Sequence, residues 1–277
     1  MISYHNITGA LKSIGLQREI PIIAHMDHPI FVRINGGATT LMGALLSTID
    51  NVMIPAFTYS TMVTPEKGPE NNYLQYGGNS KKNLDAKIFS HTLLSELPNQ
   101  EVIDILQGFP GTFRSSNPIF SFYGLGLDTV LVDHTPDKPY LPIKKLMDLG
   151  GWVVLIGVDP NQNFSIHYAE FLVGRKQFLR WALTPDGISA CPHFPGCPNG
   201  FHKLDYYLQD ELRVTVVEET KFCAVPLKTL ISTAVALLKE DPFALLCNNL
   251  QCIRCNLVRA EIRKQIASHW EQESENI

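Results

Sequence analysis

The sequence lacks the features that would place it in a membrane, in a secretion pathway or on nucleic acid. No apolar run approaches the roughly 18 residues of a spanning helix. The N-terminus, Met1 to Asn6, lacks a basic region followed by an apolar core. The net charge is −4 and no basic stripe recurs, which argues against nucleic acid as a partner but tolerates a cationic substrate. We therefore expect a cytoplasmic protein.

Charged residues are also scarce, at 18%, whereas hydrophobic residues make up 45% of the chain. This balance is typical of an enzyme with a well-buried core and unlike that of a disordered chain. The 277 residues contain no internal repeat and no linker that would divide them. We expect one domain over residues 1–277, in which 175–277 form a cysteine-containing C-terminal extension packed on the rest. The oligomeric state stays open.

Alternating strand and helix patterns predict the fold class. Short apolar runs predict strands at 20–24, 52–59, 121–126, 152–158 and 214–218. Amphipathic periods predict helices at 6–16, 101–107, 127–134, 143–149, 226–239 and 249–270. Strands separated by helices favour a three-layer α/β/α domain with a mostly buried central sheet.

The strand predicted at 152–158 should be buried on both faces of that sheet. Asn163 or Ser165 can cap the helix that follows it. This helix carries His167 and Glu170 three residues apart on one face. In an open α/β sheet, ligands bind at the carboxyl ends of the strands, so the pair is placed for chemistry. A surface helix with a plain His–Glu pair is the alternative.

A short strand and a glycine turn earlier in the chain predict a binding site for a phosphate. The strand at 20–24 delivers His25 and Asp27 to the same carboxyl edge of the sheet. After it, Gly36-Gly37-Ala38-Thr39 opens a helix, and the free backbone N–H groups at such a helix start suit an anion. The alternative is a tight turn with Thr39 near the helix cap.

Two further segments are open to a structural or a functional interpretation. Residues 60–99 lose their periodicity and form either a lid or substrate loop, or an ordered insert. Arg114 stands next to Ser115 in a rigid loop that contains Pro and Gly. Its guanidinium either clamps backbone carbonyls or binds a phosphate or carboxylate.

Four stretches, taken in order along the chain, resemble the motifs of one enzyme family. They are His25-Met26-Asp27; Gly36-Gly37-Ala38-Thr39 with Met53-Ile54-Pro55-Ala56-Phe57-Thr58; Pro110-Gly111 through Arg114-Ser115-Ser116-Asn117-Pro118 and Ser121-Phe122; and Leu155-Ile156-Gly157-Val158 with His167-Tyr168-Ala169-Glu170. Together they span roughly residues 6–175 and resemble the aminoglycoside 3-N-acetyltransferase family. Two positions depart from the family pattern, since Asp27 stands in place of a Ser and Asn117 in place of a His.

The resemblance implies transfer of an acetyl group from acetyl-CoA to an amine, without a metal and without a covalent acyl-enzyme. An alkylammonium cannot attack a thioester until it loses a proton, so His167 would act as general base and Glu170 would hold the imidazole. The implied cofactor-binding residues are His25, Asp27, Gly36, Gly37, Ala38 and Thr39, with Arg114 and Ser115 as further candidates.

For the acceptor, the resemblance implies the 3-amino group of the deoxystreptamine ring of an aminoglycoside. Three alternatives to this function stay open. The first is the same reaction on a non-antibiotic small amine, and the second is a non-catalytic relative that binds CoA. The third is a metal-dependent hydrolase that uses His25, Asp27 and His28.

Six cysteines in a chain expected in the cytoplasm should be reduced thiols or metal ligands rather than disulfides. Cys252 and Cys255 form a C-x-x-C pair, and Cys191 and Cys197 lie in a segment rich in Pro and Gly. Four thiolates from these two places could bind a structural, non-catalytic zinc ion. Buried reduced cysteines without a metal are the alternative.

Overall fold

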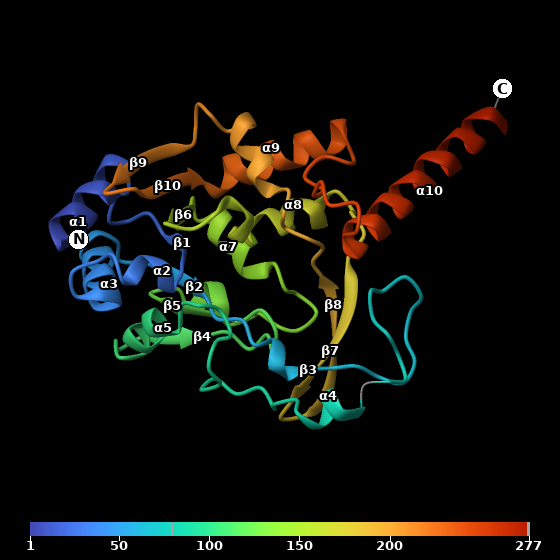
Figure 1. The fold of residues 1–277 in the computed structure, drawn as a ribbon, viewed down its shortest axis with the longest axis horizontal. Coiled ribbons are helices and arrows are strands. Elements are labelled where there is room, and N and C mark those ends of the chain that lie inside the picture. The colour runs from blue at the N-terminus through green and yellow to red at the C-terminus, as the bar shows by residue number, and fades with distance from the viewer. Residues whose placement is uncertain (79, 276–277) are drawn as a thin grey trace.

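The computed structural model describes residues 1–78 and 80–275, which form a seven-stranded sheet, flanking helices and a smaller three-stranded sheet (Figure 1). The strand order of the large sheet is β4-β5-β2-β1-β6-β10-β9. Its strands are β1 (Ile22–Met26), β2 (Val52–Pro55), β4 (Thr112–Arg114), β5 (Phe122–Leu125), β6 (Trp152–Ile156), β9 (Arg213–Val217) and β10 (Thr220–Pro226). The small sheet consists of β3 (Met62–Val63), β7 (Phe178–Thr184) and β8 (Gly187–Phe194).

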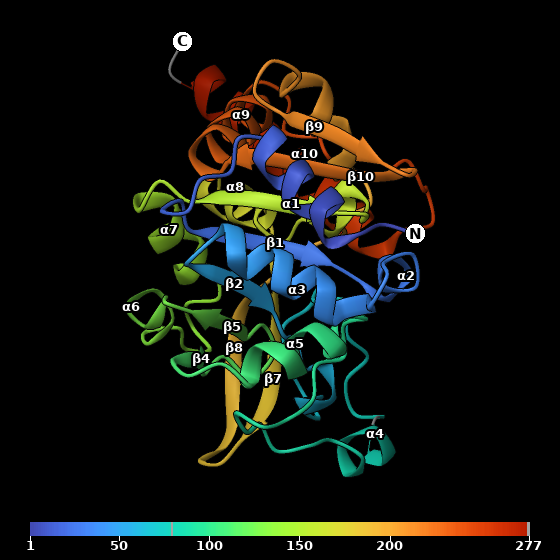
Figure 2. The same ribbon diagram turned by 90° about the vertical axis from the view of Figure 1, so that its left-hand side faces the viewer.

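Helices cover both faces of the large sheet. One face, turned to the viewer in Figure 2, carries α1 (Tyr4–Ser13), α3 (Gly37–Thr48) and α5 (Gln100–Gln107). The opposite face carries α6 (Asp128–Leu131), α7 (Leu141–Asp148), α8 (Ile166–Leu172) and α9 (Leu227–Glu240). The connections contain the short helices α2 (His28–Phe31), α4 (Ser80–Leu84), η1 (Tyr59–Thr61), η2 (Pro160–Gln162) and η3 (Phe201–Tyr207). The predicted three-layer α/β/α class is therefore confirmed.

The alternation of side chains along each strand divides the apolar residues into two cores. In β6, Val154 and Ile156 pack with α1, α3 and α5, whereas Val153 and Leu155 pack with the helices of the other face. All five residues of β6 are buried, as expected for a strand covered on both sides. The predicted central strand is thus correct, although it ends at Ile156 rather than at residue 158.

The three middle strands set the functional edge of the sheet. β1 pairs in parallel with β2 and with β6, while β5, β10 and the outermost strands run antiparallel to their neighbours. The carboxyl ends of β1, β2 and β6 therefore meet at one edge. In the register of this sheet, His25 of β1 lies beside Leu155 of β6. Parallel strands of this kind place ligand-binding loops at their carboxyl ends.

Several elements differ from the predicted ones. β2 ends at Pro55 instead of residue 59, and the helix predicted at 127–134 is only Asp128–Leu131. Strand β8 was not predicted, because most of its side chains are partly or fully exposed and show no apolar alternation. Strand β10 was also missed. It follows a turn formed by Glu218 and Glu219, both with positive φ, and two glutamates are typical of a polar loop.

Residues 60–99, predicted as a lid or an ordered insert, lie along the small sheet. The amide of Asn72 donates to the Leu179 carbonyl at 2.9 Å and accepts the Leu179 N–H at 2.7 Å. The N–H of Phe89 donates to the Leu183 carbonyl at 2.9 Å. Asn79 lies outside the described residues. These contacts show that this part of the segment packs in an ordered way on β7, and they leave the choice between a substrate loop and an insert open.

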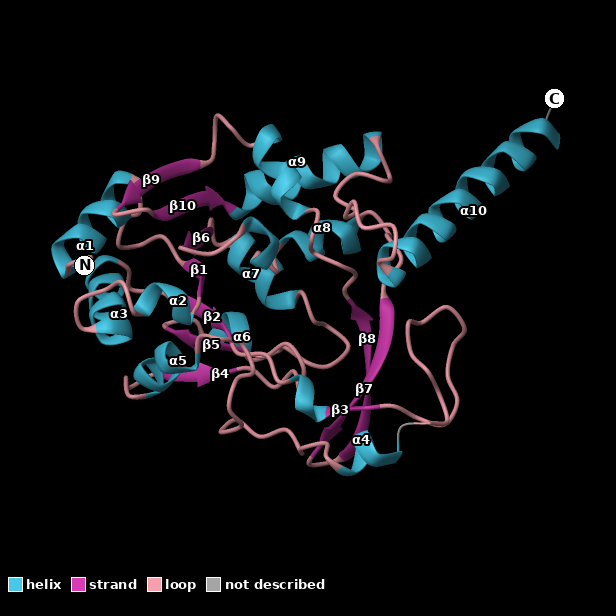
Figure 3. Cartoon of the chain, viewed as in Figure 1, coloured by secondary structure: helices cyan, strands magenta, loops and turns pink. Residues whose placement is uncertain are grey.

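The C-terminal helix α10 (Ile253–Glu275) extends away from the body of the fold (Figure 3). It was predicted at 249–270 and begins a few residues later. Its few buried side chains lie in its first turns, among them Cys255 and Val258. Across the described residues, no helix combines the length and the apolar character needed to cross a membrane.

Gly151 offers a test of how tightly the connection from α7 to β6 is packed. A Cβ at this position would lie 2.7 Å from the Leu146 carbonyl oxygen and 3.1 Å from that of Pro21. We expect Gly151→Ala to lower the free energy of unfolding by about 1–3 kcal/mol, measured by urea denaturation. The matched control is Gly9→Ala in α1, where a Cβ meets no atom within 4 Å and should stabilise the helix by about 0.5–1 kcal/mol. Equal stability of Gly151→Ala and wild type would contradict the observed packing.

Candidate active site

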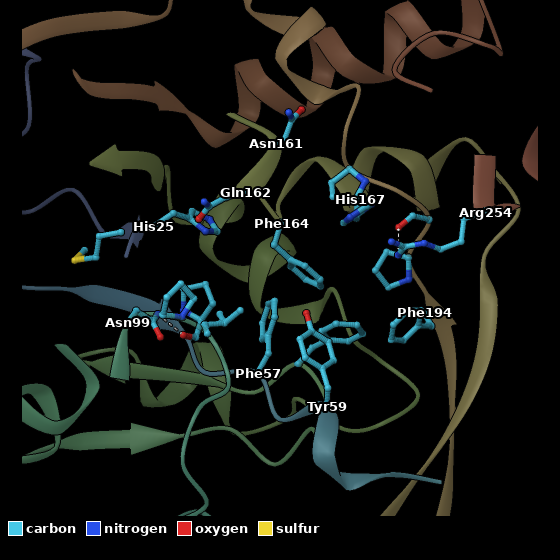
Figure 4. Close-up of a pocket in the computed structure, with 18 residues that line it drawn as sticks. His25, Phe57, Tyr59, Asn99, Asn161, Gln162, Phe164, His167, Phe194 and Arg254 are labelled. Carbon is cyan, nitrogen blue, oxygen red and sulfur yellow. Dashed lines mark hydrogen bonds between the residues drawn. The ribbon is translucent and has the colours of Figure 1, made fainter. Parts of the chain in front are cut away.

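A cavity of about 350 Å³ opens at the carboxyl ends of β1, β2 and β6 (Figure 4). Each of these strands, or the segment directly after it, contributes to the wall. The lining residues are His25, Met26, Pro55, Phe57, Tyr59, Leu97, Pro98, Asn99, Phe120, Asn161, Gln162, Phe164, His167, Phe194, Pro195, Gly196, Pro198 and Arg254. The structure thus brings His25 and His167 together in one cavity, on either side of Phe164 in the view of Figure 4.

His167 is held by α8 and by a carboxylate on the same helix. Ser165 is the N-cap of α8, and its N–H donates to the Asn163 side chain at 3.1 Å. One turn on, Glu170 Oε2 lies 2.6 Å from His167 Nδ1. An ionised carboxylate only accepts hydrogen bonds, so Nδ1 carries the proton and donates it. Nε2 is therefore the ring nitrogen that can accept a proton from a ligand in the cavity.

The other oxygen of Glu170 is held by a buried arginine. Arg175 Nη1 donates to Glu170 Oε1 at 2.9 Å, and its Nη2 donates to the carbonyls of Pro242 and Ala244 at 2.6 and 2.7 Å. Burial alone would raise the pKa of Glu170, but the hydrogen bonds and charges of His167 and Arg175 outweigh it and lower that pKa. Glu170 is thus an anion that orients His167.

His25 is a second buried imidazole of the cavity wall. Only 6% of its surface is exposed, and burial lowers its pKa to about 3, so it is neutral at physiological pH. Its Nε2 is buried without a hydrogen-bond partner among the described residues. Buried polar atoms are normally paired. This unpartnered nitrogen fits the predicted role of His25 in binding a ligand.

Asp27 and the glycine turn lie outside the cavity wall. Asp27 accepts a hydrogen bond of 3.1 Å from Gln162, which does line the cavity. Gly36 and Gly37 have φ of 83° and 61°, and Gly36 is the N-cap of α3. Gly37 to Thr39 form the first turn of that helix, in which Ala38 is buried and Thr39, like Gly36, is exposed. They can therefore contact only a part of a ligand that extends beyond the cavity.

Arg114 and Ser115 are buried and hydrogen-bonded within the fold, which favours a structural role for both over the predicted role as cofactor ligands. Arg114 is 3% exposed and donates to the Ser121 hydroxyl and to the carbonyls of Ala56, Ser90, His91 and Leu93. Ser115 is fully buried, and its hydroxyl accepts the N–H of Phe122. The guanidinium therefore acts as the clamp on backbone carbonyls that the sequence left as the alternative.

Several cavity residues were missed by the sequence analysis. Tyr59 lies in the short helix after β2, and burial raises its pKa to about 12, so its hydroxyl stays a donor. Asn99, which precedes α5, ends the segment 60–99 that was predicted as a possible substrate loop but was not singled out. Arg254 lies at the start of α10, far from the other cavity residues in the sequence. Arg254 lies between the two cysteines of the C-x-x-C motif. The spacing of that motif indicates a metal site and gives no sign that the residue between the cysteines lines a cavity.

The structure also changes the predicted metal ligands. Among the described residues, the one group of His, Cys, Asp and Glu close enough to share an ion is Cys197, Cys247, Cys252 and Cys255, here called the thiol cluster. The prediction of Cys191 as a ligand is wrong, because Cys191 lies in β8 and packs into the core beside the large sheet. Cys247, from the segment after α9, takes its place.

The positions of three closely spaced polar residues after β1 contradict the hydrolase alternative. His25, Asp27 and His28 form no such group within the described residues. His28 turns instead to Glu101, with 3.0 Å between Nδ1 and Oε1.

The sequence of this chain matches one known protein family over most of its length. The profile of the aminoglycoside 3-N-acetyltransferase family matches residues 23–239. The chain belongs to this family. The predicted resemblance is therefore confirmed.

Two relatives show how far this acetyltransferase-family chain has diverged in sequence. It is 22% identical over 189 residues to the aminoglycoside N(3')-acetyltransferase-like protein YokD of Bacillus subtilis (strain 168), covering 63% of this chain and 66% of that protein. It is 26% identical over 184 residues to aminoglycoside N(3)-acetyltransferase IX of Micromonospora chalcea, covering 62% and 63%. The matched stretches span about two thirds or less of each relative.

Solved structures of the family share the fold over nearly the whole chain. The ligand-free structure of AAC(3)-IVa superposes with a TM-score of 0.75 at 18% identity and covers 93% of this chain and 97% of that one. The binary complex of AAC-IIIb with CoASH superposes with a TM-score of 0.67 at 20% identity and covers 86% and 96%. In AAC(3)-IVa the shared fold thus extends beyond the residues that the family profile matches.

The role of Arg114 as a carbonyl clamp in this family member can be tested by stability. Removing the guanidinium leaves several buried carbonyls unpaired, each at a cost of about 1–3 kcal/mol. We expect Arg114→Ala to lower the free energy of unfolding by at least about 3 kcal/mol, measured by urea denaturation. The exposed Arg33→Ala is the control and should change it by less than about 0.5 kcal/mol. A weaker affinity for CoA with unchanged stability would instead make Arg114 a ligand.

The buried histidines predict how stability depends on pH. Burial lowers the pKa of His25 and of His134 to about 3. Because these values lie below the unfolded value near 6.5, stability is full above about pH 6.5 and falls as the pH drops toward 3. Each group contributes about 1.4 kcal/mol per pH unit. We expect the free energy of unfolding, measured by urea denaturation, to fall less between about pH 7 and about pH 5 in His134→Gln than in wild type. The exposed His5→Gln is the control and should behave as wild type. An unchanged slope would contradict the buried, neutral state.

Proposed function

We propose that this protein transfers the acetyl group of acetyl-CoA to the amino group of a small molecule. The observation that carries the proposal is the buried carboxylate–imidazole pair of Glu170 and His167, whose free ring nitrogen is available to the cavity. The reaction joins the amine nitrogen to the acetyl carbon, breaks the carbon–sulfur bond and leaves CoA with a free thiol. An amine that arrives as an ammonium first gives up one proton, which leaves to solvent. The neutral amine must then lose a second proton as the amide forms, and the leaving sulfur must gain one.

His167 is the group that moves this proton. Its Nε2 accepts the proton of the attacking amine, and Glu170 stabilises the imidazolium that results. The same Nε2 then supplies a proton to the leaving sulfur, which returns His167 to its starting state. Proton transfer by a positioned side chain contributes about 10²–10⁴-fold to a rate. The rest must come from positioning the substrates and from donors to the charge that develops on the carbonyl oxygen.

His25 and Tyr59 are the candidates for those donors. Both line the cavity, and both keep their protons on neutral rings at physiological pH, because burial lowers the pKa of His25 and raises that of Tyr59. His25 Nε2 has no partner among the described residues, and the neutral ring can donate from it when the proton is on that nitrogen. Donors that are already in place cost no reorganisation when charge develops.

Acetyl-CoA has two ends that need separate sites, and the chain offers both. When bound, it supplies the electrophilic thioester carbonyl. The cavity with His25 fits that end. The segment Gly36-Gly37-Ala38-Thr39 fits the diphosphate at the start of α3, where the N–H of Gly37 already donates to Ile34 and those of the next residues would serve the anion. Asp27, hydrogen-bonded to Gln162 beside the cavity, lies between the end of β1 and α2. The complex of AAC-IIIb with CoASH supports CoA as the ligand.

For the acceptor, we propose the 3-amino group of the deoxystreptamine ring of an aminoglycoside. The family membership of this chain supports this choice. So do the complexes of a mutant of AAC(3)-IVa with a gentamicin and with apramycin, and of AAC-VIa with sisomicin.

The cytoplasm, where acetyl-CoA is made and used, is the compartment we propose, and six cysteines without disulfides agree with it.

One observation favours a second candidate, an amine that carries fewer charges. None of the described residues that line the cavity is Asp or Glu, and Arg254 adds a positive charge to the wall. Aminoglycosides carry several ammonium groups, and an interface discriminates against unpaired like charges. The aromatic wall of Phe57, Phe120 and Phe164 suits a more apolar amine.

A thiol-release assay with acetyl-CoA tests the reaction and separates the two acceptors. We expect release, with the acetylated product identified by mass spectrometry, on a panel of gentamicin, sisomicin, apramycin, glucosamine and cyclohexylamine. Turnover with the three deoxystreptamine drugs selects the first acceptor, and turnover with the simple amines alone selects the second. No product with any amine would contradict an acetyltransferase acting on such compounds.

His167→Ala tests the base assignment in the same assay. We expect kcat to fall by at least about 100-fold, while the Kd for CoA, measured by calorimetry, stays within a few-fold. His5→Ala, an exposed histidine in α1, is the matched control and should behave as wild type. A normal kcat in His167→Ala would remove the base assignment.

A further inference from the structure

The thiol cluster joins three separate segments beside the cavity. Cys197 follows β8, Cys247 follows α9, and Cys252 and Cys255 stand at the start of α10. Their four sulfur atoms lie within 4.8 Å of one another. Three of the four residues are buried, and Cys252 is half-buried. The acetyl-transfer chemistry uses none of them.

We propose that the thiol cluster binds one zinc ion as four thiolates, and that this ion holds Arg254 and the loop at 195–198 against the cavity. The proposal concerns a structural site and does not depend on the acetyl-transfer reaction. It adds to the sequence prediction a different fourth ligand, Cys247, and a consequence for the cavity wall.

The geometry of the cluster fits a tetrahedral ion. Zinc–sulfur bonds of about 2.3 Å place tetrahedral sulfur atoms about 3.8 Å apart. Four sulfurs within 4.8 Å therefore reach that arrangement with shifts of about an ångström or less. Cys252 is at the start of α10, and its carbonyl accepts the N–H of Asn256 at 2.9 Å.

Three cationic side chains donate hydrogen bonds to backbone carbonyls at or next to the ligand residues. Arg254 Nη1 donates to the carbonyl of Gly196, which precedes Cys197, at 2.9 Å. Arg259 Nη2 donates to the carbonyl of Cys247 at 2.5 Å, and Lys203 Nζ donates to the carbonyl of Leu246 at 2.7 Å. A zinc ion with four thiolates carries a net negative charge. Cations next to each ligand loop offset that charge and orient the ligands.

Apolar packing around the cluster is limited to a small local core. The local apolar core contains the cysteines with Leu246, Val258 and Ile262 as its buried aliphatic residues, and it is separate from the two large cores. A core of this size supplies little stability, and small modules commonly depend on a metal for this reason. The remaining length of α10 projects away from the fold and cannot anchor it.

The cluster is connected to the cavity through residues adjacent to its ligands. Arg254 lies between Cys252 and Cys255 and lines the cavity, and Gly196 and Pro198 flank Cys197 and line it as well. Figure 4 shows Arg254 on the same side of the cavity as Phe194 and His167. An ion bound to the cluster would thus fix one wall of the cavity from outside. Losing the ion would release that wall without touching His167.

Metal analysis of the full-length protein, purified under reducing conditions without chelator, tests the ion. We expect about one equivalent of zinc per chain for four thiolate ligands. Cys247→Ser should lose the zinc, whereas Cys191→Ser, which alters a buried cysteine outside the cluster, should retain it. Less than about half an equivalent in wild type, iron in place of zinc, or zinc loss in Cys191→Ser to the same extent would overturn the proposal.

Cobalt(II) substitution gives a test that does not need the variant to fold. Wild-type protein exchanged with cobalt(II) should show the visible d–d bands of tetrahedral thiolate coordination together with sulfur-to-cobalt charge transfer. A spectrum of octahedral cobalt, or none, would contradict four thiolate ligands.

Limited trypsin digestion tests the link to the cavity wall. In the zinc-loaded protein, the bonds after Arg254 and Arg259 should resist cleavage, and they should be cut much faster after the ion is removed with a strong chelator. The exposed bond after Arg33 serves as the internal control and should be cut at the same rate in both forms. Equal cleavage after Arg254 with and without zinc would overturn the positioning role. None of these measurements uses acetyl transfer, so a failure here leaves the proposed reaction untouched, and the reverse also holds.

Discussion

The buried carboxylate of Glu170 is the interaction on which the arrangement of the site depends. Glu170 is only 3% exposed, and a buried carboxylate is tolerated only when its oxygens are hydrogen-bonded to donors. Here His167 donates to one oxygen and Arg175 donates to the other. Arg175 in turn binds two carbonyls of the segment after α9. The orientation of the imidazole is therefore fixed by contacts that run from α8 into the C-terminal part of the chain. The base cannot be positioned by its own helix alone.

The cavity is assembled in the same way from distant parts of the chain. The parallel strands β1, β2 and β6 bring their carboxyl ends to one edge, which supplies His25 and the segment that leads to His167. The far wall comes from the residues after β8 and from Arg254 at the start of α10. The thiol cluster lies directly behind that wall. The metal proposal and the catalytic proposal therefore concern neighbouring parts of one structure, although each stands on its own observations.

The elements that could be predicted are those whose burial follows a regular period. β6 is apolar on both faces, and α9 shows a clear apolar stripe, so both were recognised from local pattern. β8 and β10 were missed, because β8 is largely exposed and β10 follows a turn of two glutamates. Their pairing with β7 and β6 is a contact between segments, and local sequence carries no signal for it. The fold class was still predicted correctly, because it depends on the alternation of strands and helices along the chain and not on every pairing.

The sequence by itself determined the pair of His167 and Glu170, because three residues on a helix place two side chains on one face whatever surrounds them. It also determined that two cysteines of the C-x-x-C motif stand together. Only the tertiary structure decided that Arg114 is a buried clamp, that Cys247 and not Cys191 completes the thiol cluster, and that Arg254 faces the cavity. These three outcomes depend on which distant backbone segments meet, and that is set by the packing of the whole chain rather than by spacing within one segment.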